Sequence, residues 1–370
     1  MPERQWSQGA ALAALSGLEH MGSARLLAAL EGRTPAAVVA WLRSGGAPAG
    51  IARAEAAGWR AELDRFDVSA AEAALAENGI HASWAGSPDH PGFLNDDVGP
   101  APVLFRRGHP IDESAPAVAI VCTRRASGVG REIARELGLG LAEAGVMVVS
   151  GLALGIDGAA HEGALLTDGA PPLAFVGGGA DVVYPKRHHD LWRRMVERGT
   201  VASEAPPGSP PLPWRFPARN RLIAAAADIV VVVESRAAGG SLLTVNEAIR
   251  RDRQVMAVPG SLRNPAAAGA NALLADGCAP VLDVDDVLTA LGLSGAERTA
   301  RREPGGPTSP GVGDRSPAAG RVLDSCDDGP ASIDELVART GLGVTEVLAA
   351  VSELLVAEAV VDDGARIRHR

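Results

Sequence analysis

The hydrophobic pattern of the first 84 residues is helical. Leucines recur at helical spacing between residues 10 and 63, and Gly17 and Gly22 interrupt them, which predicts several short helices. The piece from Leu18 to Leu26 loosely resembles a helix-hairpin-helix turn, but a plain helical bundle agrees better with the pattern. Residues 85–108 are rich in Pro and Gly and contain one short strand candidate, Val103–Arg106.

From Ala117 onward, continuous apolar runs alternate with amphipathic stretches. This alternation is typical of a parallel sheet whose two faces are covered by helices. We therefore expect an α/β fold with a Rossmann-like, doubly wound parallel sheet. The predicted strands are Ala117–Val121, Val146–Val149, Leu173–Val176, Val201–Ser203, Ile229–Val233 and Val255–Val258, and the predicted helices are Arg131–Ala144, Gly158–Leu166, His188–Arg198, Arg219–Ala227 and Leu242–Arg251.

After Leu293 the composition collapses to Gly, Pro, Ser, Arg and Thr, which predicts a flexible linker. Helical spacing returns at about residue 318 and ends in a short hairpin pattern, so a small winged-helix-like domain is expected. Its acidic residues favour a partner-binding or regulatory role over DNA reading. The expected domains are a helical domain at 1–84, an extended Rossmann-like domain at 85–293, a linker at 294–317 and the winged-helix-like domain at 318–370.

Composition and charge place any polyanion site in the middle of the chain. The 370 residues are 46% hydrophobic and carry a net charge of −10. Residues 117–260 hold sixteen Lys and Arg against fourteen Asp and Glu, a net +2, so the remainder carries −12. A surface covered with basic residues is therefore excluded, and a nucleic-acid site is expected to be local.

The cysteine pattern and the apolar runs predict a cytoplasmic protein. Cys122, Cys278 and Cys326 are far apart and match no CxxC or zinc spacing, so reduced thiols are expected and no metal site. The longest apolar run, Leu222–Val233, is interrupted by Asp228 and is too short to span a bilayer. The N-terminus has no secretory signal pattern, and no membrane partner is expected.

Loops rich in small residues follow several of the predicted strands. In a doubly wound sheet, ligands bind outside the carboxyl ends of the strands, where helix N-termini and backbone N–H groups attract anions. We therefore expect several anion cradles to face one crevice. Their candidate residues are Arg124, Ser127 and Gly128 after the first strand, Gly151 after the second, Lys186 after the third, and Gly240, Ser241 and Thr244 after the fifth.

The segment Phe216–Arg221 combines a ring with two guanidinium groups where a Pro-rich loop becomes a helix. A ring can stack on a base, and arginine forks can hold phosphate. Simple salt bridges at a helix start are the alternative, but positive charge there opposes the helix dipole. We therefore assign Phe216, Arg219, Asn220 and Arg221 to ligand binding.

Common nucleotide and hydrolase sites do not match these loops. Gly128-Val129-Gly130 lacks the third glycine of a dinucleotide fingerprint, and the chain's single lysine, Lys186, is not in a P-loop. No G-x-S-x-G elbow follows a strand. Asp157 and His161 lie one turn apart on a predicted helix, and a structural contact is the better interpretation. No cofactor and no catalysis are expected.

The same residues resemble the DNA-processing protein A (DprA, Smf) family along most of the chain. The match is carried by ordered blocks: residues 120–127, 150–157 with Ala160-His161, Tyr184-Pro185, Ser203-Glu204, Phe216–Arg221, 240–244 and 257–260. The tail, including Gly320–Leu323 and Ile333–Leu336, looks like the family's winged-helix appendage. The chain departs from the family pattern at His90, Cys122 and Val245.

The resemblance implies a cytoplasmic, non-catalytic protein that binds incoming single-stranded DNA, protects it and loads the RecA recombinase during natural transformation. It also implies a homodimer. By motif, Arg124 would contact the DNA backbone, Phe216 would stack on or line the base pocket, and Gly240, Ser241 and Thr244 would supply contacts at a helix N-terminus. The alternative hypothesis is a phosphoribohydrolase of the Lonely Guy type acting on nucleoside monophosphates, although the P-G-G-x-G-T-x-x-E loop of that family is missing.

Overall fold

The structure, a computed structural model, describes residues 6–121, 123, 126–293, 317–327, 331–356, 360–362 and 367–369. The chain divides into two compact units, Met1–Arg301 and Arg302–Arg370, and each is described by itself. No helix among the described residues is long and apolar enough to cross a membrane.

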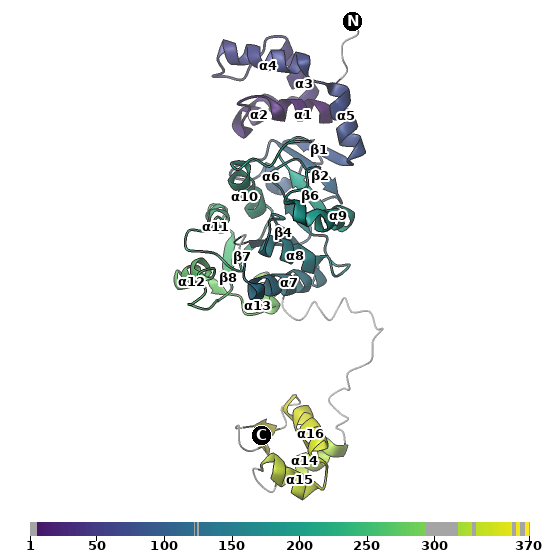
Figure 1. The fold of residues 1–370 in the computed structure, drawn as a ribbon, viewed down its shortest axis with the longest axis vertical. Coiled ribbons are helices and arrows are strands. Elements are labelled where there is room, and N and C mark those ends of the chain that lie inside the picture. Colours follow the sequence, from purple (N-terminus) through teal and green to yellow (C-terminus); the bar gives the residue numbers. More distant parts are fainter. Residues whose placement is uncertain are drawn as a thin grey trace. The chain divides into compact units, whose positions relative to one another are not determined.

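Five helices open the first unit and gather at one end of it beside the first strand (Figure 1). Their apolar faces form a core around Trp59 and Leu63, each of which is 1% exposed. The indole Nε1 of Trp59 donates a 2.8 Å hydrogen bond to the carbonyl of Glu19, which fixes the turn between the first two helices. The helices are α1 (Gln8–Gly17), α2 (Ser23–Leu30), α3 (Pro35–Arg43), α4 (Arg53–Arg65) and α5 (Val68–Glu77).

A nine-stranded sheet forms the centre of this unit. Its order is β1-β2-β6-β5-β4-β3-β7-β8-β9, and all the pairs from β6 to β9 are parallel. Strand β2 pairs in antiparallel fashion with both β1 and β6. The bounds are β1 (Ile80–Trp84), β2 (Val103–Gly108), β3 (Ala117–Val121), β4 (Met147–Ser150), β5 (Leu173–Phe175), β6 (Thr200–Ser203), β7 (Ile229–Val232), β8 (Gln254–Ala257) and β9 (Ala279–Pro280).

Alternate residues of the central strands supply two separate cores. Val118 and Ile120 of β3 face one layer of helices, whereas Ala119 and Val121 face the other. This alternation follows from the two-residue period of a strand, and burial on both faces explains the continuous apolar runs. One layer contains α6 (Gly92–Asn95), α10 (Arg215–Ala225), α11 (Ser241–Ile249) and α12 (Ala268–Ala275), and the other contains α7 (Gly128–Glu143), α8 (Ile156–Ala164), α9 (His189–Arg198) and α13 (Val284–Ala290).

The second unit is a three-helix cluster with a two-stranded hairpin. Helix α15 begins with a capping box between Ser332 and Glu335 and ends at Gly341, whose φ of 68° is left-handed. Buried apolar residues, including Val322 and Leu336, form the core of this second unit. The elements are α14 (Pro317–Asp327), α15 (Ile333–Thr340), α16 (Val344–Val356), β10 (Val360–Asp362) and β11 (Ile367–His369), and this order is that of a winged-helix domain.

The structure confirms the α/β fold class with a Rossmann-like sheet, flanking helices and a winged-helix domain. The six strands predicted from Ala117 onward are present, each within one residue at either end. Helix α7 starts at Gly128, three residues earlier than expected, because Ser127 caps it by accepting a hydrogen bond from Gly130 N. Strand β1 was not expected, because residues 1–84 were assigned to a helical domain, although Ile80–Trp84 alternates apolar and polar residues.

Candidate nucleic-acid interface

Two aromatic rings meet beside the glycine-rich carboxyl ends of β4 and β5. The centroids of the Phe216 and Tyr184 rings lie 5.6 Å apart, with their planes at 43°. Both rings line a cavity of about 140 Å³, which we call the aromatic pocket. Backbone from the loops after β4 and β5, including Gly151, Gly177 and Gly178, forms the rest of its wall with nearby apolar residues.

The glycines of this pocket are required by close packing. A Cβ at Gly177 would lie 3.2 Å from Phe216 Cδ1, tighter than ordinary contact. A Cβ at the buried Gly151 would collide with the guanidinium of Arg219. The absence of side chains at these two positions therefore lets a ring and a guanidinium approach the strand ends. The structure thus brings the predicted site residues Gly151 and Phe216 together in one pocket.

Arg219 is not a lining residue of the aromatic pocket, but it contacts Gly151, which is. The residue is only 6% exposed, and its Nη1 donates hydrogen bonds to the carbonyl of Gly151, at 2.8 Å, and to the carbonyl of Phe175. These carbonyls lie at the ends of the neighbouring strands β4 and β5, so Arg219 ties the two loops together. Its assignment to phosphate binding stays a prediction, and the observed contacts are structural.

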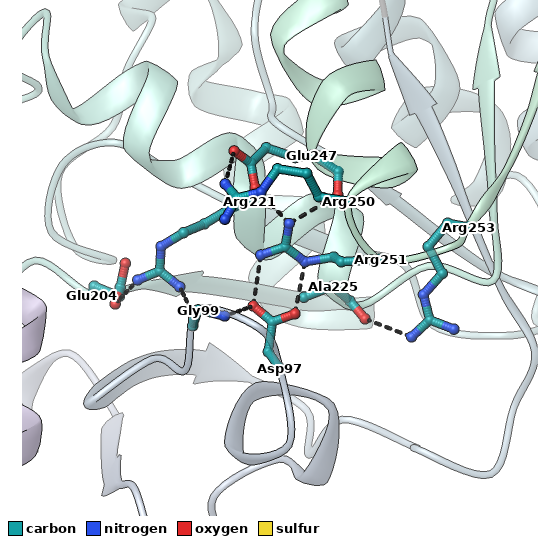
Figure 2. A network of polar contacts seen from close by, with 9 residues as sticks. All are labelled: Asp97, Gly99, Glu204, Arg221, Ala225, Glu247, Arg250, Arg251 and Arg253. Carbon is teal, nitrogen blue, oxygen red and sulfur yellow. Dashed lines mark hydrogen bonds and ion pairs between the residues drawn. The ribbon is translucent and has the colours of Figure 1, made fainter.

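Arg221 holds a different segment. Its Nη2 lies 2.5 Å from Glu204 Oε1, and its Nη1 donates a 2.7 Å hydrogen bond to the carbonyl of Gly99 (Figure 2). Burial raises the pKa of Glu204, and the positive charge of Arg221 opposes that rise. In this structure the ion pair at the end of β6 therefore engages the guanidinium that the sequence assigned to ligand binding.

A second arginine, Arg251, holds the same segment before β2 that Arg221 contacts at Gly99. Arg251 Nε and Nη2 donate to the two carboxylate oxygens of Asp97 at 2.7 and 2.6 Å, and both side chains are 4% exposed (Figure 2). Arg251 Nη1 also lies 2.5 Å from Glu247 Oε2. Asp97 in turn accepts a hydrogen bond from Gly99 N. Two arginines from the α10–α11 layer thus position the segment before β2, a role that sequence reasoning missed.

The N-terminus of α7 already holds an anionic side chain. Glu234, which follows β7, accepts hydrogen bonds from Ser127 N at 2.8 Å and from Ser127 Oγ at 2.6 Å. Asn264 Nδ2 donates to the same carboxylate, and a Cβ at Gly130 would collide with it. In a nucleotide-binding Rossmann fold, this switch-point position receives phosphate. Glu234 therefore explains in physical terms why the crevice beside Ser127 and Gly128 is unsuited to a dinucleotide.

The side chains at the start of α11 also point into the protein rather than to solvent. Ser241 is 5% exposed, and its hydroxyl donates a 2.8 Å hydrogen bond to Ser235 Oγ. Thr244 is 2% exposed, whereas Gly240 lies at the surface. Only the backbone of Gly240 is thus presented at the surface among these three predicted residues.

The remaining predicted residues lie in three places. Lys186 is exposed in a short 3-10 helix, η1 (Lys186–His188), directly after Tyr184 and Pro185, which both line the aromatic pocket. Asn220 is half-buried on α10. Arg124 and Cys122 lie outside the described residues. The contacts of Lys186 and Asn220 with DNA stay predictions.

Two histidines of the first unit are buried and neutral. Burial, with His188 and Arg219 nearby, lowers the pKa of His161 to about 3. Burial lowers the pKa of His90 to about 4. The Nε2 of His90 lies 2.9 Å from the carbonyl of Ala101, which can only accept, so this nitrogen carries the proton and Nδ1 faces Ser83 Oγ. His90, one of the positions where the chain departs from the family pattern, is therefore a buried imidazole with a hydrogen-bond partner at each ring nitrogen.

Acidification is expected to destabilise the protein through His161. Its pKa in the folded state is below the unfolded value of 6.5, so between pH 6.5 and about 3 the unfolded state binds a proton that the folded state does not. His161 therefore lowers the free energy of unfolding by about 2 kcal/mol at pH 5, compared with its value above pH 7. Urea titrations of wild type and His161→Gln at both pH values measure this difference. An identical pH dependence in the two proteins would contradict it.

Comparison with known proteins gives consistent matches. The family model for DNA recombination-mediator protein A matches residues 81–292, and the model for the DprA winged helix domain matches residues 302–362. A putative DNA processing protein DprA of Mycobacterium tuberculosis is 39% identical over 249 residues, covering 67% of this chain and 63% of that protein. The chain therefore spans less than two thirds of the length of this relative. The DNA processing protein DprA of Bacillus subtilis is 32% identical over 240 residues, covering 64% of this chain and 80% of that protein.

Two solved structures are similar in fold. The X-ray structure of DNA processing protein A from Streptococcus pneumoniae has a TM-score of 0.62 and 30% identity, and the match covers 75% of this chain and 95% of that one. The DNA processing protein A structure from Helicobacter pylori, described in terms of its single-stranded DNA binding mode, has a TM-score of 0.52 and 26% identity. That match covers 57% of this chain and 95% of the other.

Proposed function

Because the chain belongs to the DNA recombination-mediator protein A (DprA/Smf) family, we propose that it binds single-stranded DNA at the carboxyl edge of its sheet. The observation that carries the proposal is the aromatic pocket. The rings of Phe216 and Tyr184 stand beside glycine backbone, and the exposed Lys186 lies next to them. Rings that stack on bases beside a cation are the usual means of holding a single strand without reading its sequence.

In the cell, we propose that the bound strand is incoming DNA during natural transformation, that the protein protects it, and that it loads the RecA recombinase onto it. We place the protein in the cytoplasm, propose that it acts as a homodimer, and propose no catalytic step. The Glu234 carboxylate at the start of α7 supports a binding role over nucleotide chemistry, since it already occupies the backbone N–H and the hydroxyl of Ser127 that a nucleotide phosphate would use.

The proposal is tested by fluorescence anisotropy with labelled oligothymidine and a duplex of equal length, over a range of salt concentrations. We expect the protein to prefer the single strand and its affinity to fall as salt rises, because phosphate contacts release counterions. Salt-insensitive binding, or none, would contradict the proposal. Loading is tested separately, by RecA nucleation on strands precoated with single-strand binding protein, with and without this chain.

Lys186→Gln is expected to reduce the salt dependence of binding by about one released counterion. Lys186 is exposed and directly follows the pocket residues Tyr184 and Pro185, so the substitution removes one proposed phosphate contact without disturbing the core. Arg193→Gln on α9 is the matched control, because it removes an exposed charge that pairs with Glu197 outside the pocket.

Lys186 also permits a direct footprint, since it is the chain's only lysine. We expect bound oligothymidine to slow its acetylation by an amine-reactive reagent, as measured by mass spectrometry, while the N-terminal amine serves as the internal reference. Equal labelling with and without DNA would place Lys186 outside the interface.

A further inference from the structure

A larger groove lies between the N-terminal helices and the loop before α10. One wall is the turn that joins α1 to α2, and the other is the segment that ends in Trp214 and Arg215. We call this cavity, of about 760 Å³, the turn groove. Its lining residues include Met21, Arg25, Trp214 and Arg215.

The side chain of Trp214 is left in solvent. It is 64% exposed, and among the described aromatic side chains only Tyr184, at 42%, is also classed as exposed. An exposed indole contributes nothing to the core. A single exposed apolar ring is common on protein surfaces, but an indole offers a flat face on which a base can stack.

The charge of the turn groove is opposite to that of the protein. None of its lining residues is acidic, although the chain carries a net charge of −10. Arg25 is neutralised by Glu55 at 2.5 Å. The guanidinium of Arg215 lies 5.2 Å from the centre of the Trp214 ring and donates to the carbonyl of Pro210, and no carboxylate among the described residues pairs with it. An anionic occupant is therefore complementary to this groove.

A third cavity lies between the turn groove and the aromatic pocket and shares lining residues with both. This cavity, of about 160 Å³, shares Val176 and Gly177 with the aromatic pocket. At its other end it shares Met21, Trp214 and Arg215 with the turn groove. A strand whose base reaches Phe216 would run along this row of neighbouring cavities toward Trp214, two residues earlier in the chain.

We propose that the turn groove holds the next nucleotides of the single strand bound in the aromatic pocket. A base stacks on Trp214, Arg215 contacts the adjoining phosphate, and the turn between α1 and α2 forms the opposite wall. This inference rests on the proposed function and extends it, because it gives the N-terminal helices a part in the length of strand that is bound.

The test measures affinity against strand length. Oligothymidines of about 4 to 16 nucleotides cover the range of site sizes found in single-strand binding folds. We expect Trp214→Ala and Arg215→Gln to bind the shortest strands as wild type does. For strands long enough to reach the turn groove, we expect affinity to fall about fivefold or more in Trp214→Ala. Arg193→Gln again serves as the charge control, and circular dichroism checks the fold.

Each other outcome overturns the inference. If Trp214→Ala weakens all lengths equally, the indole supports the aromatic pocket and the groove is not an extension of the site. If no length is affected, Trp214 does not touch DNA. If sedimentation shows that Trp214→Ala changes the oligomeric state, the groove is a protein contact. Absence of binding by wild type at every length overturns the proposed function itself, and is thereby distinguished from a failure of this inference alone.

Discussion

Replacing Asp97 with alanine is expected to lower the free energy of unfolding by about 3–5 kcal/mol, the usual cost of removing one partner from a buried ion pair. Asp97 and Arg251 are each 4% exposed and share two hydrogen bonds of 2.7 and 2.6 Å. After the substitution the guanidinium stays buried with Glu247 as its remaining carboxylate partner. Urea unfolding followed by circular dichroism measures the change.

A double variant distinguishes the cost of an unpaired buried charge from the net contribution of the ion pair to stability. Asp97→Leu with Arg251→Met replaces both charges by apolar side chains, and such exchanges are often neutral or stabilising. We therefore expect the double variant to be more stable than Asp97→Ala. Arg250→Gln is the matched control, since Arg250 also contacts Glu247 but its side chain is 62% exposed. A loss below 1 kcal/mol in Asp97→Ala would contradict the assigned role of the pair.

Phe216→Ala is expected to weaken oligothymidine binding by about 5- to 150-fold, which corresponds to the 1–3 kcal/mol that one stacked base contributes. The ring is half-buried, tilted against Tyr184, and faces Gly177 across the aromatic pocket. Fluorescence anisotropy at fixed salt gives the affinity.

Phe216→Tyr is the matched control, because it keeps the ring and its stacking face. We expect it to bind within a few-fold of wild type. Equal weakening in both variants would show that the position matters for packing at the start of α10 and that stacking is not involved. The salt dependence of Phe216→Ala should stay that of wild type, since a neutral ring releases no counterions.

Much of the Rossmann-like sheet was predictable because the apolar runs, helix caps and glycine-rich loops that define it each lie within a few residues of sequence. The continuous apolar run Ala117–Val121 is buried on both faces in β3, as its composition requires. Ser127 at the start of α7 is a local cap and could have been predicted from its position. The grouping of glycine-rich loops at one edge follows from parallel strands, and the structure shows it at Gly151 and Gly177.

The contacts of the charged residues with other protein groups, rather than with a ligand, were not predictable. Arg219 and Arg221 have the composition of a phosphate grip, yet one holds the ends of β4 and β5 and the other pairs with Glu204. Sequence reasoning weighed salt bridges against ligand binding, and nothing local to the helix start distinguishes the two.

The sequence by itself determined the six strands from Ala117 to Val258 and the helices between them, the family, and the glycine-rich edge, because apolar periodicity and short motifs are properties of neighbouring residues. Only the tertiary structure decided which polar groups face a ligand. Ser127 meets Glu234 across 107 residues, and Arg251 meets Asp97 across 154. Such partners are brought together by the packing of the sheet and its helices, so their pairing leaves no trace in the spacing along the chain.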